Sequence, residues 1–132
     1  MVWRLLIVLV LAVSACSGDA EDTEDGDGAG REGCADVVAV EIVEQGDVFQ
    51  ISATVSSADT GDEKYADVWE VRAPDGTVLG ERVLAHPHVD EQPFTRSQAM
   101  EIPNDVAVVT VAAHDSVVGF CGATVDAAVP GR

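Results

Sequence analysis

The chain has 132 residues, which is room for one small domain and excludes a second domain once a leader and a linker are set aside. Its 24 acidic and 7 basic residues give a formal net charge of −17, which argues against nucleic acid as a partner because phosphate binding needs clustered Lys and Arg. The hydrophobic content of 47% is enough for a buried core. We attribute the acidity to solubility or to a salty habitat before any specific ligand.

The first 15 residues have the pattern of a secretory signal peptide. Arg4 supplies a positive charge, residues 5–13 form an apolar run, and Ser14 and Ala15 are small. The apolar run is too short for a membrane-spanning helix, which needs about 20 apolar residues. We therefore expect residues 1–15 to form a helical signal peptide that is removed.

Val13, Ser14, Ala15 and Cys16 together resemble the lipobox of bacterial lipoproteins, in which small residues fit the lipoprotein signal peptidase. The resemblance implies that the sulfur of Cys16 carries a diacylglycerol. The protein would then be anchored by lipid to the cell membrane or the outer membrane, facing the periplasm or the extracellular space. The alternative is an ordinary signal peptide followed by an incidental cysteine.

Residues 16–33 are predicted to form an acidic, disordered linker. They include no large apolar side chain, so they cannot offset the entropy of ordering. Six carboxylates repel one another and anionic headgroups: Asp19, Glu21, Asp22, Glu24, Asp25 and Asp27. A spacer of this length reaches at most roughly 60 Å, and we expect it to hold the domain clear of the bilayer.

Cys34 and Cys121 remain as a pair if Cys16 carries the lipid. In an oxidising compartment an even number of cysteines indicates a disulfide. Two free thiols that bind a metal are the alternative, which the lack of a C-x-x-C spacing disfavours. A disulfide requires that the two Cα atoms lie within about 7 Å of each other.

Residues 34–132 are predicted to be an all-β domain. Phe49, Ile51, Ala53 and Val55 alternate with polar residues, which is the period of a half-buried strand. We expect strands at residues 36–45, 47–57, around Trp69 and Val71, 77–84, around Met100 and Ile102, 106–113 and 123–129, separated by turn residues such as Pro74, Asp75 and Gly76. About seven short strands without a helical period predict an antiparallel β-sandwich, immunoglobulin-like or fibronectin-III-like, with Trp69 as its central core aromatic.

If successive strands reverse direction, alternate loops lie at the same end of the sandwich. Residues 59–66, 86–96 and 114–120 should therefore converge, with Cys34 and Cys121 beside them.

Residues 86–96 read His-Pro-His-Val-Asp-Glu-Gln-Pro-Phe-Thr-Arg, and with residues 69–76 they resemble a family of exported bacterial β-sandwich proteins that share an H-P-H-x-x-E-Q-P-F-T-R signature. The likeness runs from about residue 65 to residue 130. The family usually has a D-x-x-H-G-x-G-G pattern near its end, where this chain has Val118 for the histidine and Cys121 for a glycine. The resemblance implies export and a β fold, and no particular activity.

The three histidines and a neighbouring carboxylate are candidate metal ligands: His86, His88, His114 and Asp115. Imidazole and carboxylate ligands together suit Cu(II) or Zn(II), and an extended His-Pro-His tripeptide presents both rings on one side. The alternative, which we favour, is that His86 and His88 form hydrogen bonds with Glu91, Gln92 and Arg96 and brace the loop.

No catalytic arrangement stands out in the sequence. Ser97 and Ser116 lack a G-x-S-x-G elbow, the adjacent Asp90 and Glu91 point apart in an extended segment, and no phosphate-binding glycine loop is present. We therefore expect a non-enzymatic, lipid-anchored module of the cell envelope that needs no cofactor and binds a partner or supports assembly. Its partners would be the membrane, through the lipid, and another envelope protein. The alternative function is a Cu- or Zn-binding envelope protein that uses the His86/His88 loop.

Overall fold

The computed structural model describes residues 31–132, so the predicted signal peptide, Cys16 and most of the predicted linker lie outside the described residues. Seven strands are present: β1 (Asp36–Gln45), β2 (Val48–Ser56), β3 (Ala66–Arg72), β4 (Val78–Val83), β5 (Phe94–Met100), β6 (Val108–Asp115) and β7 (Val125–Ala128). Within this range no helix has the length and hydropathy needed to cross a membrane. The all-β prediction is confirmed.

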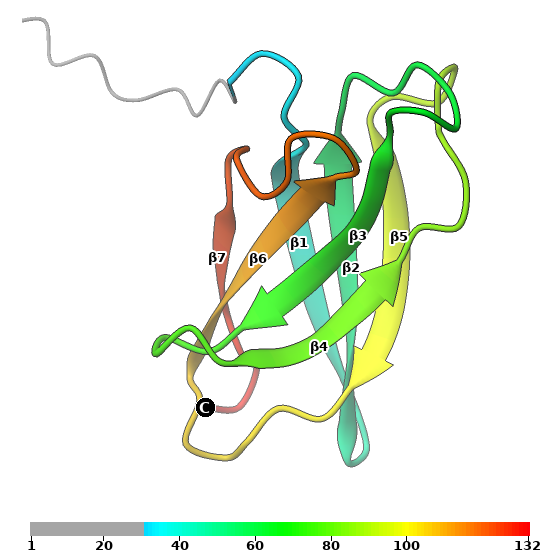
Figure 1. Cartoon of the computed structure of the whole chain (residues 1–132). Coiled ribbons are helices and arrows are strands. Elements are labelled where there is room, and N and C mark those ends of the chain that lie inside the picture. The colour runs from blue at the N-terminus through cyan, green and yellow to red at the C-terminus, as the bar shows by residue number, and fades with distance from the viewer. Residues whose placement is uncertain (1–30) are drawn as a thin grey trace, which may run out of the picture.

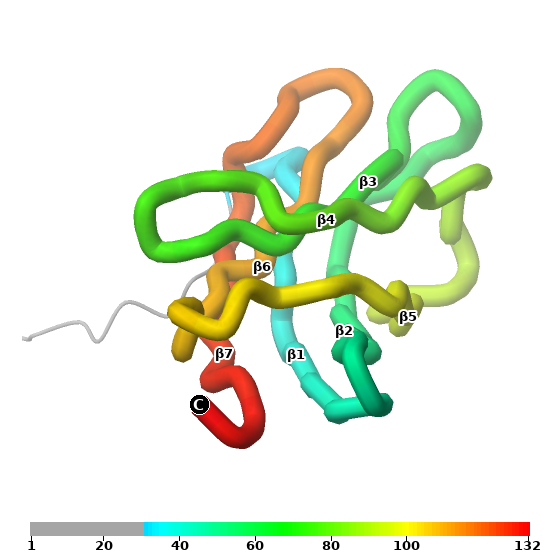
Figure 2. The backbone as a smooth tube through the Cα atoms, turned by 90° about the horizontal axis from the view of Figure 1, so that it is seen from below, coloured from blue at the N-terminus to red at the C-terminus, as the bar shows by residue number. Residues whose placement is uncertain are grey.

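The strands form two antiparallel sheets, one with the order β1-β2-β5 and the other with the order β4-β3-β6-β7. Figures 1 and 2 show the two layers, with the edge strands β4 and β5 on the same side of the sandwich. In an immunoglobulin constant-type sandwich the fourth strand joins the sheet of the first, second and fifth strands. Here β4 pairs with β3 instead. Of the two predicted arrangements, immunoglobulin-like and fibronectin-III-like, this is the fibronectin-III-like one.

The core lies between the sheets and follows the period-two pattern. Along β2 the side chains of Phe49, Ile51, Ala53 and Val55 are buried, and the residues between them are half-buried. Trp69 of β3 is fully buried, so the prediction of a central core aromatic is confirmed. Full burial of one large aromatic side chain contributes up to about 3 kcal/mol, which makes this residue a main part of the core.

One strand differs from its prediction. The expected strand around Met100 and Ile102 begins at Phe94 and ends at Met100, and Ile102 is buried beyond its end. The alternation of apolar and polar residues did not reveal the start of this strand, because β5 is an edge strand and one of its inward positions is occupied by the polar Arg96. Arg96 pairs in register with the buried Ala53 of β2.

Candidate functional site

Three loops and the start of the described chain meet at one end of the sandwich, which we call the loop end. It consists of residues 31–35, 57–65, 84–93 and 116–124 (Figure 1). The amide of Ser116 donates to the carbonyl of Tyr65 at 2.9 Å, and the amide of His88 donates to Asp59 Oδ2 at 2.8 Å. These hydrogen bonds link the loops to one another, so the predicted convergence is confirmed.

A disulfide joins Cys34, just before β1, to Cys121 in the β6–β7 loop. Their Cα atoms are 5.5 Å apart, inside the limit for such a bond. The predicted pairing is confirmed, and it attaches the beginning of the domain to a loop that is 87 residues away in the sequence.

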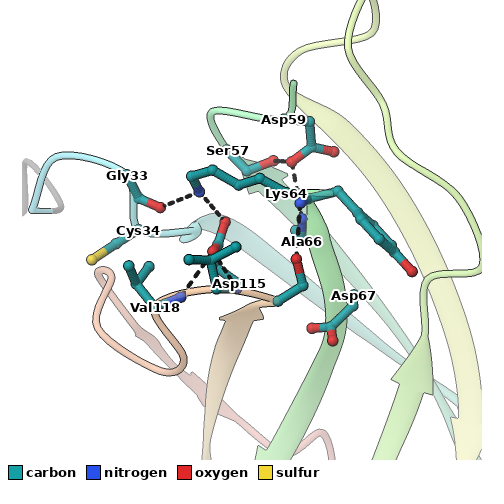
Figure 3. Close-up of polar contacts among 12 residues, drawn as sticks. Gly33, Cys34, Ser57, Asp59, Lys64, Ala66, Asp67, Asp115 and Val118 are labelled. Atoms are coloured by element: carbon teal, nitrogen blue, oxygen red, sulfur yellow. Dashed lines mark hydrogen bonds and ion pairs between the residues drawn. The ribbon is translucent and has the colours of Figure 1, made fainter. Parts of the chain in front are cut away.

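Lys64 and Asp115 form an ion pair beside this disulfide (Figure 3). Asp115 is fully buried, and the ammonium of Lys64 also donates to the carbonyl of Gly33 at 2.7 Å. Burial acts to raise the pKa of Asp115, but the hydrogen bonds from Lys64 and from the amides of Val117 and Val118 hold that pKa below its ordinary value. Asp115 is therefore an ionised anchor that joins three segments of the loop end.

Asp59 is the second buried carboxylate of the loop end, and it was not among the residues predicted from the sequence. Its side chain accepts hydrogen bonds from the hydroxyl of Ser57 at 2.6 Å, the amide of Ala66 at 2.9 Å and the amide of His88 at 2.8 Å. The Ser57-x-Asp59 spacing after a strand is the only local signal, because polar side chains at such positions commonly bond neighbouring backbone. The contact with His88 depends on tertiary structure alone.

His88 is the third residue of residues 86–96, which we call the signature segment, and it is only 4% exposed. Its ring stacks on Phe94 with a centroid distance of 3.8 Å and an interplanar angle of 9°, and the ring of His86 lies 4.6 Å away. Burial lowers the pKa of His88, and the positive charges of Arg96 and His86 lower it further, against the opposing effect of Glu91 and Asp59. His88 is therefore a neutral imidazole in the folded protein near neutral pH.

The signature segment is braced by hydrogen bonds, partly in the predicted way. Neither ring nitrogen of His88 has a hydrogen-bond partner among the described residues. Instead the carbonyl of His88 accepts from Gln92 Nε2 at 3.0 Å, while Glu91 pairs with Arg96 through two contacts of 3.1 and 3.4 Å. Bonding to Arg96 lowers the pKa of Glu91. The predicted bracing is thus confirmed for His88 with Glu91 and Gln92, through the carbonyl of His88 and not its ring, whereas Arg96 pairs with Glu91 and not with a histidine.

The four candidate metal ligands are not brought together as one site. Across residues 31–132 no three His, Cys, Asp or Glu side chains are grouped so that they could hold a metal ion. His114 Nδ1 pairs with Asp67 Oδ1 at 2.6 Å, Asp115 pairs with Lys64, and His86 Nδ1 lies 3.0 Å from the carbonyl of Pro87. The physical reason is the alternation of a strand, which sends the side chains of His114 and Asp115 to opposite faces of β6. The structure therefore places His114 and Asp115 in separate pairs and brings only the rings of His86 and His88 together, with centroids 4.6 Å apart, so metal binding by the His86/His88 loop stays a prediction.

The chain is 38% identical over 104 residues to a protein of Halomicrobium mukohataei that is named "Putative lipoprotein". The match covers 78% of this chain and 50% of the relative, so the chain spans about half the length of the curated relative that it matches. No protein-family model matches the chain, and no solved structure does. The chain is thus similar to a lipoprotein over most of its own length.

Proposed function

We propose that the chain is a lipid-anchored module of the cell envelope. In this proposal it is exported, cut before Cys16, and held at a membrane by a lipid on the sulfur of that cysteine. The observation that carries the proposal is the similarity to a protein named as a lipoprotein, which agrees with the Val-Ser-Ala-Cys pattern of the leader.

The contacts of the loop end support a binding role in preference to catalysis. The ionisable groups in and next to the loop end are engaged with one another: Asp115 with Lys64, Glu91 with Arg96, and Asp67 with His114. Such pairs stabilise the conformation of the loops. Groups that are already paired are not available to exchange a proton with a substrate. Loops gathered at one end of an immunoglobulin-like sandwich are a common binding surface. We therefore assign a binding role, and no catalytic role, to the loop end.

The lipid anchor is tested by replacing Cys16 with serine in the full chain. We expect the protein to move from the membrane fraction to the soluble fraction and to lose incorporation of a labelled fatty acid. Ser17→Ala, a substitution next to the acylated position, is the matched control and should leave both properties unchanged. Membrane association that persists in the Cys16→Ser chain, or a mature N-terminus at another residue by mass spectrometry, would refute the anchor.

A further inference from the structure

The turn that follows β6 is held rigidly and presents two valines to solvent. Asp115 Oδ1 accepts hydrogen bonds from the amides of Val117 and Val118 at 2.9 and 3.1 Å, and the backbone groups of Asp115 and Gly119 bond each other at 2.8 and 3.1 Å. The side chains of Val117 and Val118 are nevertheless 63% and 49% exposed. The turn is therefore an apolar tip whose conformation is set before any partner arrives, which lowers the entropy cost of binding.

The tip lies where the chain enters the domain. Lys64 bridges Gly33 and Asp115, and the disulfide joins Cys34 to Cys121, three residues after Val118. Figure 3 shows the contacts that link the tip to this point: the amide of Val118 donates to Asp115, and Lys64 contacts both Asp115 and Gly33. Only about 17 residues separate Gly33 from Cys16, so even a fully extended chain keeps this tip within roughly 60 Å of a lipid on that cysteine.

The tip also carries no charge of its own. Residues 116–120 read Ser-Val-Val-Gly-Phe, within a chain whose net charge is −17. Asp115 beneath the tip is fully buried and neutralised by Lys64. Contact with a lipid surface through Val117 and Val118 would therefore bury apolar area without removing a charged group from water, whereas Phe120 has the guanidinium of Arg72 4.6 Å from its ring centroid.

We propose that the Val117–Val118 tip inserts into the interface of the bilayer to which the chain is anchored, so that the loop end faces the membrane. The proposal rests on the lipid anchor proposed above and adds an orientation to it. The occupant is a lipid surface and not a protein, because the tip is fixed next to the point where the tether leaves the domain. This docking departs from the expectation that the acidic linker holds the domain clear of the bilayer. It requires neutral headgroups, or salt that screens the repulsion between the linker carboxylates and anionic headgroups.

The test uses the full lipidated chain in phosphatidylcholine vesicles that contain a lipid with a doxyl quencher, with one tryptophan placed at the tip. Val118→Trp reports on the tip, and Val43→Trp is the matched control, since Val43 is 46% exposed near the opposite end of β1. Trp69 is fully buried and contributes the same background to both variants. We expect quenching of the Val118→Trp emission at least about two-fold stronger than that of Val43→Trp, with a blue shift of the former alone.

A third variant separates insertion of the native tip from attraction by the new tryptophan. Val117→Asp in the Val118→Trp chain places a charge on the tip, and we expect it to abolish the quenching. Quenching that persists in this double variant, or equal quenching of the tip and control variants, overturns the docking. Protein that stays with the vesicles while the tip remains unquenched also overturns it and leaves the anchor intact. A blue shift of the Val118→Trp emission that occurs in native membranes but not in the lipid vesicles indicates a protein occupant and refutes the lipid proposal. Protein that does not stay with the vesicles refutes the anchor, and the docking with it.

Discussion

Asp59 is the residue whose replacement should disturb the loop end most, because one buried carboxylate joins three segments. Its side chain is shielded from solvent, and it accepts from the hydroxyl of Ser57, the amide of Ala66 and the amide of His88. Asp59→Ala removes all three acceptor contacts. The amides of Ala66 and His88 would then be left without a partner in buried positions.

The size of the effect follows from the two orphaned amides. A buried donor that loses its acceptor costs about 1–3 kcal/mol, so two of them cost about 2–6 kcal/mol, and we expect a loss of about 4 kcal/mol. Asp59→Asn is a milder change of the same shape. It keeps an oxygen for Ser57 and Ala66, but it places an NH2 group opposite the amide of His88, so we expect a loss of about 2 kcal/mol. Small domains are stable by about 5–15 kcal/mol, so the alanine variant loses a large share of that stability.

The measurement is chemical denaturation of the Cys16→Ser chain, with the disulfide intact and Trp69 fluorescence as the signal. Asp90→Ala, an exposed carboxylate on the β4–β5 loop, is the control and should change the free energy of unfolding by less than about 0.5 kcal/mol. An Asp59→Ala loss below about 1 kcal/mol would show that the carboxylate does not hold the loops. An asparagine variant as stable as the unsubstituted chain would show that the contact between Asp59 and the amide of His88 adds no stability.

Three further predictions concern other parts of the fold. Burial lowers the pKa of His88 in the folded protein from its ordinary value of 6.5. Between 6.5 and the lower folded value, the unfolded chain therefore binds more protons than the folded chain. The free energy of unfolding should fall as the pH decreases through this window. Cys34→Ser/Cys121→Ser opens a loop of 87 residues and should cost about 4.5 kcal/mol in the chain-entropy model, measured by denaturant unfolding. Gly122→Ala places a Cβ 1.9 Å from the carbonyl oxygen of Ala35, so we expect a loss of about 3 kcal/mol or more in the same assay.

Each of these predictions has its own control. His88→Phe preserves the stack on Phe94 and should flatten the pH dependence in this window, and equal slopes for the two chains would contradict the assignment. A serine double variant that unfolds within about 1 kcal/mol of the disulfide-bonded chain would contradict the second prediction. Gly80→Ala brings a Cβ to 2.8 Å from the flexible side chain of Met100, so it should cost less than Gly122→Ala. The reverse order would show that the backbone near Ala35 can give way.

Several features of the domain could be predicted because each depends on a local rule. The alternation of apolar and polar residues along β2 follows from the pleat of a strand, and full burial of Trp69 follows from its place in such a pattern. The meeting of the loops, and with it the pairing of Cys34 and Cys121, follows from the reversal of direction between successive strands.

The errors arose where a side chain's partner lies far away in the sequence. His114 and Asp115 looked like neighbouring ligands, but their side chains lie on opposite faces of β6. His114 pairs with Asp67 and Asp115 pairs with Lys64, and both partners lie about 50 residues earlier in the chain. The ring of His88 looked like a hydrogen-bonding group, but packing on Phe94 buries it. Composition cannot reveal such a choice because the same side chain can serve as a ligand, an ion-pair partner or a stacked ring.

The amino-acid sequence alone predicted the all-β class, the cysteine pair and the end of the sandwich where the loops meet. It also contains the leader pattern that suggests a lipid. Those features depend on the spacing of residues along the chain, which any reader of the sequence can count. Only tertiary structure decided that β4 joins β3, that Asp59 and Asp115 are the buried anchors of the loop end, and that Val117 and Val118 remain exposed. The reason is that burial and hydrogen-bond satisfaction depend on distances between segments that are remote in the sequence, and these distances exist only after the two sheets have packed.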